Sequence, residues 1–281
     1  MKKLSLIIGL VAISLWGMAQ RNLVRPEDVK AFMASTTYVV LENNPTSQFN
    51  MEIREAVERS WKITPFKFIT AKEFNDMRKD IDKSFLVLIQ MRFDKDKIAP
   101  TYNFLSLSMG AAVSKITDMP DICSVPLSYK DLPEDTYTYK LEGLIRFMQN
   151  YIVAINEDPK LIKKDAFKFY NKNMKQIKNK ELWVTESGLE KSVRPLAEIR
   201  KVYKFNIKVV NPEDIQKAIQ EKNPNVLYLH KVGPEGSRLQ WRVWKMILGA
   251  GDDQLYYYDM HTISKSKGDG FLAKDFAKIN K

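Results

Sequence analysis

Phe66-Lys67-Phe68-Ile69 aligns with Ile207-Lys208-Val209-Val210. The alignment extends without a gap over 66–110 and 207–251, at a constant shift of 141 positions. Phe85-Leu86-Val87-Leu88 falls on Val226-Leu227-Tyr228-Leu229, and Gly110 falls on Gly251. Few residues are identical, but the order of apolar and polar positions agrees. The sequence therefore predicts an internal duplication, with two tandem related modules of one α/β (α+β) plan.

Each copy is expected to form a mixed β-sheet with helices packed on it. In the first copy, strands are expected at 37–42, 66–69, 85–93 and 101–113. Three helices are expected there: one at 51–61, one that begins at a Thr70 cap, and one at 141–155. In the second copy, strands are expected at 181–186, 205–210 and 225–232, followed by a hairpin at 241–248 and 254–260. Its three helices are expected as one at 196–202, one that begins at an Asn211 cap, and one at 271–279. Capping residues and apolar steps of three and four mark these helices.

Four segments follow from this pattern. They are a signal peptide at 1–19, a first module at 20–157, a connector at 158–180 and a second module at 181–281. The connector carries eight lysines, and its residues Phe167, Tyr170, Met174 and Ile177 recur at steps of three and four. This spacing predicts an amphipathic helix. We favour a bridging helix with its lysines in water, and the alternative is a basic helix lying on an anionic membrane or polymer.

The N-terminus has the features of a secretory signal peptide. Lys2 and Lys3 precede an apolar stretch at 4–16, and Gly17 and Ala19 stand at the −3 and −1 positions of a cleavage site. No later segment approaches the roughly 20 apolar residues of a membrane-spanning helix, and no cysteine follows the site for lipid attachment. The expected product is a periplasmic or secreted protein without a transmembrane segment.

The basic charge restricts the classes of partner. Removing Lys2 and Lys3 lowers the formal net charge from +11 to +9, because residues 1–19 contain no acid. A basic chain often binds nucleic acid, but export argues against that partner. Lipid headgroups, lipopolysaccharide phosphates and cell-wall polymers are the anions of an envelope. Solubility alone is the simpler explanation of the charge.

Catalytic and metal-binding patterns are missing from the sequence. The single Cys123 excludes an intramolecular disulfide, and His230 and His261 are the only histidines. The glycines at 249–251 are followed by a strand, whereas a phosphate-binding loop is followed by a helix. The sequence therefore predicts no cofactor, no metal and no catalytic set. Glu42 and Glu186, which follow the first strand of each copy, are the carboxylates we would assign to a hydrolase acting on glycans or peptides.

The last hairpin is rich in aromatic and cationic residues. Its candidate binding residues are Trp241, Arg242, Trp244, Lys245, Tyr256 and Tyr258. Alternation along a strand places Arg242 and Trp244 on one face and Trp241 and Lys245 on the other. One interpretation is an exposed aromatic platform for a partner, since these residue types are enriched at binding hot spots. The simpler one is an edge hairpin whose rings cover the core.

The order strand–helix–strand–helix–strand–strand in an exported chain resembles the envelope α/β modules of the TolB amino-terminal, CsgG and LpoB group. The first copy carries this likeness at 38–42, 51–61, 66–69, 70–81, 85–93 and 102–110. No β-propeller follows, as in TolB, and there is no lipid-anchor cysteine, as in LpoB. The resemblance implies a docking role in the cell envelope. The signal peptide and the Lys/Asn-rich body also resemble secreted proteins of the Bacteroidota.

Three functions therefore compete. The favoured one is an exported, non-catalytic scaffold that binds an envelope protein or a cell-wall polymer. The second is an exported hydrolase with carboxylates in a cleft. The third is a basic module in peripheral contact with an anionic membrane or lipopolysaccharide through the connector.

Overall fold

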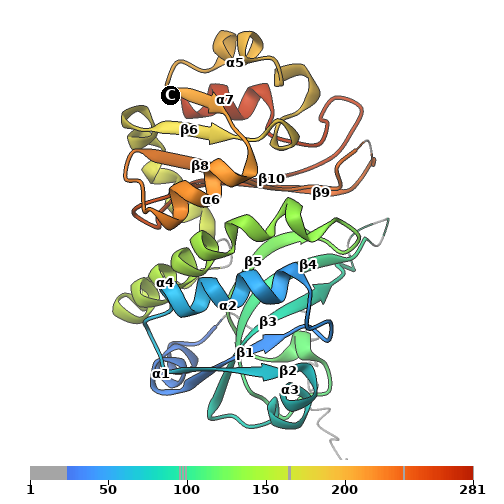
Figure 1. The fold of residues 1–281 in the computed structure, drawn as a ribbon, viewed down its shortest axis with the longest axis vertical. Helices are drawn as coiled ribbons and strands as arrows, with labels where there is room; N and C mark the ends of the chain where they lie inside the picture. Colours follow the sequence, from blue (N-terminus) through green and yellow to red (C-terminus); the bar gives the residue numbers. More distant parts are fainter. Residues whose placement is uncertain are drawn as a thin grey trace, which may run out of the picture.

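A computed structural model describes residues 24–94, 96, 98, 100–163, 166–236 and 238–280. Two β-sheets are stacked along the long axis of the molecule, with helix α4 (Leu141–Glu157) between them (Figure 1). The expected signal peptide at 1–19 lies outside the described residues.

The first sheet has five strands in the order β2-β1-β3-β4-β5. Their bounds are β1 (Thr36–Leu41), β2 (Phe66–Thr70), β3 (Lys83–Met91), β4 (Tyr102–Met109) and β5 (Asp121–Tyr129). β1 runs parallel to its neighbours β2 and β3, whereas β4 runs antiparallel to its neighbours β3 and β5. The parallel connections run through α2 (Gln48–Ser60) and α3 (Ala71–Met77), and α1 (Pro26–Ala34) precedes the sheet.

The second sheet has five strands in the equivalent order, β7-β6-β8-β9-β10. Their bounds are β6 (Glu181–Val184), β7 (Ile207–Val209), β8 (Val226–Val232), β9 (Arg242–Gly249) and β10 (Leu255–Thr262). β6 is parallel to β7 and β8, and the remaining pairs are antiparallel. Its helices are α5 (Leu196–Val202), α6 (Pro212–Gln220) and α7 (Ala273–Ile279). The expected α/β fold of two mixed-sheet modules is confirmed.

Local chemistry explains where several helices begin. The Thr70 hydroxyl accepts a hydrogen bond from the Glu73 amide at 3.2 Å, and the Glu73 carboxylate accepts from the Thr70 amide, so a capping box starts α3. In the second module, the Asn211 amide donates to Asp214 at 3.2 Å, and Pro212 occupies the first turn of α6. These are the caps that the sequence predicts.

Gly110 and Gly251 have the same role in the two modules. A Cβ at Gly110 would overlap the carbonyl oxygen of Asp80, just after α3. A Cβ at Gly251 would come within 2.5 Å of the carbonyl oxygen of Lys222, just after α6. Each glycine therefore lets the end of a central strand approach the turn that leaves the preceding helix.

Helix α4 is shared by the two modules. With α1 and α2 it covers one face of the first sheet, while α3 covers the other. Its opposite side packs, together with α6, on one face of the second sheet, and α5 and α7 cover the far face. The expected stripe that includes Leu144, Ile145 and Met148 is buried, but Gly143 and Arg146 are buried too. α4 is thus a central layer and not only the closing helix of the first module.

The connector is helical over most of its described part, and its helices are of the 3₁₀ type. It contains two 3₁₀ helices, the three-residue η4 (Pro159–Leu161) and η5 (Ala166–Asn179), which is 14 residues long. Tyr170 and Ile177 are buried, as the apolar stripe predicts. The Asn171 amide donates to the Tyr258 carbonyl at 3.0 Å and accepts from the Tyr258 amide at 2.7 Å, so it pairs with the edge of β10. These two bonds fix the connector against the edge strand of the second sheet.

Candidate functional site

Two of the predicted aromatic residues of the hairpin, Trp241 and Trp244, lie between the modules. The Trp244 side chain is 5% exposed, and its ring centroid is 4.9 Å from that of Tyr102 and 5.7 Å from that of Phe104. The Trp241 ring stacks on Tyr129 at 4.9 Å with an interplanar angle of 9°. We call this contact the aromatic seam, and its rings are Phe93, Tyr102, Phe104, Tyr129, Trp241 and Trp244.

Polar contacts reinforce the aromatic seam. The Arg242 guanidinium pairs with Asp96 of the first module at 2.5 Å. The Tyr129 hydroxyl donates to the Arg242 carbonyl oxygen at 2.7 Å. Arg242 therefore joins the modules through both its side chain and its backbone.

Helix α7 packs on the other face of the hairpin. Lys245 is fully buried, and its ammonium nitrogen lies 2.7 Å from both carboxylate oxygens of Asp275 and 3.3 Å from Asp259. The Tyr257 hydroxyl donates to Asp275 at 2.8 Å. Tyr256, 2% exposed, donates its hydroxyl to Asp252 at 2.5 Å.

The structure does not show the exposed aromatic platform that was one of the two interpretations of the hairpin. Trp244, Lys245 and Tyr256 are buried, while Trp241, Arg242 and Tyr258 are half-buried. The reason is that both faces of the hairpin are covered, one by the first module and the other by α7. The structure agrees with the simpler interpretation, in which the rings cover the core.

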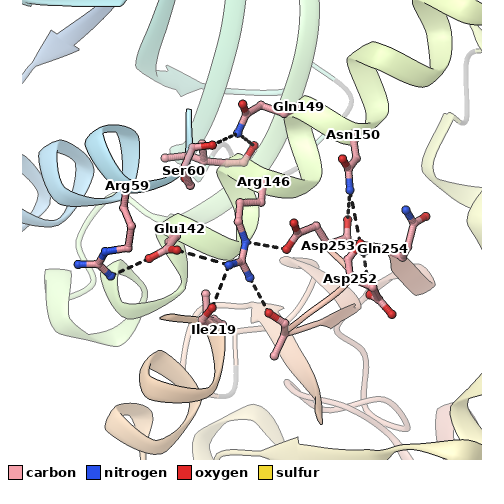
Figure 2. A network of polar contacts seen from close by, with 12 residues as sticks. Arg59, Ser60, Glu142, Arg146, Gln149, Asn150, Ile219, Asp252, Asp253 and Gln254 are labelled. Atoms are coloured by element: carbon pink, nitrogen blue, oxygen red, sulfur yellow. Dashed lines mark hydrogen bonds and ion pairs between the residues drawn. The ribbon is translucent and has the colours of Figure 1, made fainter. Parts of the chain in front are cut away.

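A polar network centred on Arg146 forms a second contact between the modules (Figure 2). Its guanidinium donates to the carbonyl oxygens of Ile219 at 2.9 Å and Ala250 at 2.5 Å, and Nε lies 2.6 Å from Asp253. Glu142, one turn earlier in α4, lies 3.4 Å from Arg146 and 2.9 Å from Arg59. The buried charge of Arg146 thus meets two carboxylates and two carbonyl groups, as an interior arginine requires.

A small hollow lies beside this network. It has a volume of about 10 Å³ and is lined in part by Glu52, Glu55, Arg59 and Glu142. The Gln216 side-chain amide, which also lines the hollow, donates a hydrogen bond to the Glu52 carboxylate at 2.9 Å. Burial raises the pKa of Glu52. This volume accommodates about one water molecule, so the hollow has no room for a substrate.

A larger groove opens where α4, the connector and the β9–β10 turn meet. Its volume is about 470 Å³, within the range of small-molecule sites. It combines aromatic rings with amides and charged groups, and the lining residues are Phe147, Asn150, Ala154, Asp158, Leu161, Phe169, Tyr170, Lys172, Asn173, Asp253 and Gln254. We call it the connector groove. The sequence prediction missed it, because the groove forms only where residues of 147–173 meet Asp253 and Gln254, which are far away in the sequence.

The carboxylates assigned to a hydrolase are not brought into a common groove. Glu42 follows β1 in the first module, Glu186 lies in the turn after β6, and neither lines the connector groove or the small hollow. Burial, with a smaller effect from Glu134, raises the pKa of Glu42. Glu134 accepts a hydrogen bond from the Phe49 amide at 2.8 Å, so it caps the start of α2.

The histidines and the cysteine have structural positions. His230 is fully buried, and its Nε2–H donates to the Pro126 carbonyl oxygen of the first module at 2.8 Å. His261 contacts the Gly268 carbonyl oxygen at 2.8 Å. Cys123 is buried, which raises its pKa. Among the described residues, no group of three or more His, Cys, Asp or Glu is arranged to hold a metal ion.

Comparisons with known proteins identify no relative. No family model matches the chain, no curated protein matches it, and no solved structure matches it. None of the helices that the described residues form combines the length and the hydrophobicity needed to cross a membrane.

Proposed function

We propose that the mature chain is an exported, non-catalytic scaffold of the cell envelope that binds a partner in the connector groove. The observation that carries this proposal is the composition of the groove. α4 contributes Phe147 and Asn150, the connector contributes Phe169 and Asn173, and the second module contributes Gln254. A site assembled from three segments exists only while the modules are packed together.

The groove is supported by contacts that limit its movement. Arg146 ties α4 to Asp253, which lines the groove. The Asn173 amide donates to the Leu255 carbonyl oxygen at 2.9 Å, which ties the connector to β10. A site that is already ordered loses less conformational entropy when a partner binds.

The lining of the groove favours binding over catalysis. Its two carboxylates are engaged, since Asp253 pairs with Arg146 and Asp158 accepts from the Lys160 amide at 3.1 Å. The described lining contains no histidine, cysteine or serine to act as a base or a nucleophile. Rings, amides and one lysine are groups that recognise a ligand.

The role in the envelope rests on the sequence. A signal peptide at 1–19 supports export, and the layout resembles docking modules of the TolB, CsgG and LpoB group. The equivalent strand order of the two sheets and the shared role of Gly110 and Gly251 support an origin by internal duplication.

Two measurements test the proposal. Mass spectrometry of the exported protein should find Gln20 at its N-terminus. Purified protein should co-sediment saturably with insoluble envelope material and release no soluble sugar or peptide from it. Release of such products would favour the hydrolase, and a protein that stays in solution at every concentration of envelope material would overturn the scaffold.

A further inference from the structure

The connector presents a row of lysines to solvent. Its apolar residues Phe167, Tyr170, Met174 and Ile177 pack against the two modules. The exposed lysines of its described part are Lys160, Lys163, Lys168, Lys172, Lys175 and Lys178. The connector groove opens on this basic segment, because Lys172 lines it.

Several amide groups of the groove have hydrogen-bonding capacity that the described residues leave unused. Asn150 donates its amide to the carbonyl oxygen of Asp253 at 3.3 Å, and Asn173 donates to that of Leu255, so the amide oxygen of each has no partner among the described residues. The Gln254 side chain makes no hydrogen bond to any described residue, and Figure 2 shows it beside Asp253. Such amides can donate to and accept from hydroxyl groups.

An aromatic ring completes the set. Phe169 is half-buried and lines the groove, with its ring edge-on to Tyr170 at 5.7 Å. The ammonium nitrogen of Lys172 lies 3.7 Å from the centroid of the Phe169 ring. A flat apolar surface, a cation and amides that keep an unused oxygen among the described residues therefore occur together.

We propose that the connector groove binds an anionic polysaccharide, that is, a sugar chain bearing carboxylate or phosphate groups. The amides recognise sugar hydroxyls, Phe169 packs on the apolar face of a ring, and the lysines attract the charges along the chain. This inference rests on the proposed scaffold function and names the chemistry of its partner.

A membrane surface fits these observations less well. A helix that lies in a membrane interface inserts an apolar face. The apolar residues of the connector are instead directed toward the modules, where Tyr170 is 8% exposed and Ile177 is fully buried. Charge alone would fit any polyanion, so the amides and Phe169 are what select a sugar chain.

Binding to polymers of one backbone tests the proposal. Carboxymethyl-dextran and phosphorylated dextran are compared with neutral dextran and with polyglutamate of matched charge density by isothermal titration calorimetry. We expect both charged dextrans to bind roughly tenfold more tightly than either control polymer, a difference of about 1.4 kcal/mol. Binding should weaken as salt is added, because the lysines are exposed.

Matched variants separate the groove from general charge. Lys160→Gln/Lys163→Gln/Lys172→Gln should weaken binding by roughly tenfold. Lys72→Gln/Lys79→Gln/Lys115→Gln removes the same charge from exposed positions in the first module and should have little effect. Gln254→Ala removes a half-buried side chain that has no described hydrogen bond, and it should weaken dextran binding by roughly fivefold without changing thermal stability.

Several outcomes would overturn the polysaccharide assignment. Equal binding of polyglutamate, with no effect of Gln254→Ala, would indicate simple ion exchange. Binding to phosphatidylglycerol vesicles but not to dextrans would assign the lysines to a membrane. If no charged dextran binds while the protein still co-sediments with envelope material, the scaffold stands and the sugar ligand is wrong. Loss of both kinds of binding would reject the scaffold as well.

Discussion

The Nε atom of Arg146 lies 2.6 Å from the Asp253 carboxylate, although the two residues belong to different modules. Arg146 sits in the middle of α4, and its side chain is 4% exposed. Burial raises the pKa of Asp253 in spite of the nearby guanidinium. Burying this pair costs free energy, because both charges lose their contact with water. Removing one member costs more, because it leaves the other charge buried without compensation.

Replacing Arg146 with methionine should separate the contribution of its charge from that of its volume. Arg146→Met leaves Glu142 and Asp253 without their shared cation, and it removes two donors to backbone carbonyls. We expect the free energy of unfolding to fall by about 3–5 kcal/mol. Chemical denaturation followed by tryptophan fluorescence measures this loss.

Arg59→Met is the matched control. Arg59 also pairs with Glu142, at 2.9 Å, but its side chain is 41% exposed. A partly exposed pair contributes about 0–1 kcal/mol, so this variant should be only slightly less stable. A loss from Arg146→Met as small as the roughly 0–1 kcal/mol expected for Arg59→Met would show that the Arg146 network does not hold the modules together.

Gly143 sets how closely α4 approaches the second sheet. A Cβ at this position would overlap the Tyr228 hydroxyl of β8, which is fully buried. Gly143→Ala should therefore lower the free energy of unfolding by about 1–3 kcal/mol through overpacking, even though alanine favours helices.

Tyr228→Phe supplies the rescue in a double-mutant cycle. It removes the atom nearest to the added methyl group, and the Tyr228 hydroxyl has no hydrogen-bond partner among the described residues. Gly143→Ala/Tyr228→Phe should recover a large part of the loss. Simple additivity of the two changes would contradict this steric account.

The succession of most helices and strands along the chain could be predicted from the sequence, because the alternation of apolar and polar residues and the helix caps are local signals. The shift that aligns 66–110 with 207–251 places α3 over α6, β3 over β8 and β4 over β9. The caps at Thr70 and Asn211 are confirmed as well. Such signals depend on neighbouring residues, so one sequence is enough to detect them.

The contact between the modules could not be predicted in this way. In the sequence, the polar residues Arg146, Gln149 and Asn150 have the spacing of an exposed helix face. In the structure, Arg146 and Gln149 are buried. The available signal was Gly143, since a glycine inside a long helix usually marks a close approach. The connector groove was missed for the same reason, because it depends on which segments meet in space.

The buried ion pair of Lys245 and Asp275 should stabilise the second module. Lys245→Met leaves Asp275, which is 1% exposed, beside Asp259 without a cation. We expect a loss of about 3–5 kcal/mol, measured as faster amide hydrogen exchange in β9 and α7. Adding Asp275→Asn should restore part of it. Lys201→Met, which removes an exposed partner of Glu198, should leave this exchange almost unchanged.

His230 should make stability depend on pH. Burial, with a smaller effect from Lys140, lowers its pKa to about 3, whereas an unfolded histidine has a pKa of about 6.5. Between these values the unfolded chain binds a proton and the folded chain does not. Stability should therefore be retained above about pH 6.5 and fall toward pH 3, by up to about 1.4 kcal/mol per pH unit from this group.

His230→Gln tests this dependence, because glutamine keeps a donor for the Pro126 carbonyl oxygen but does not titrate. Urea denaturation of both proteins at intervals from pH 7.5 to pH 4 measures the difference in their free energies of unfolding. At pH 7.5 the difference reports only packing and the hydrogen bond. As pH falls below 6.5, the wild-type protein should lose stability more steeply than the variant, since the carboxylates titrate in both. Parallel curves would show that the His230 site admits a proton without cost.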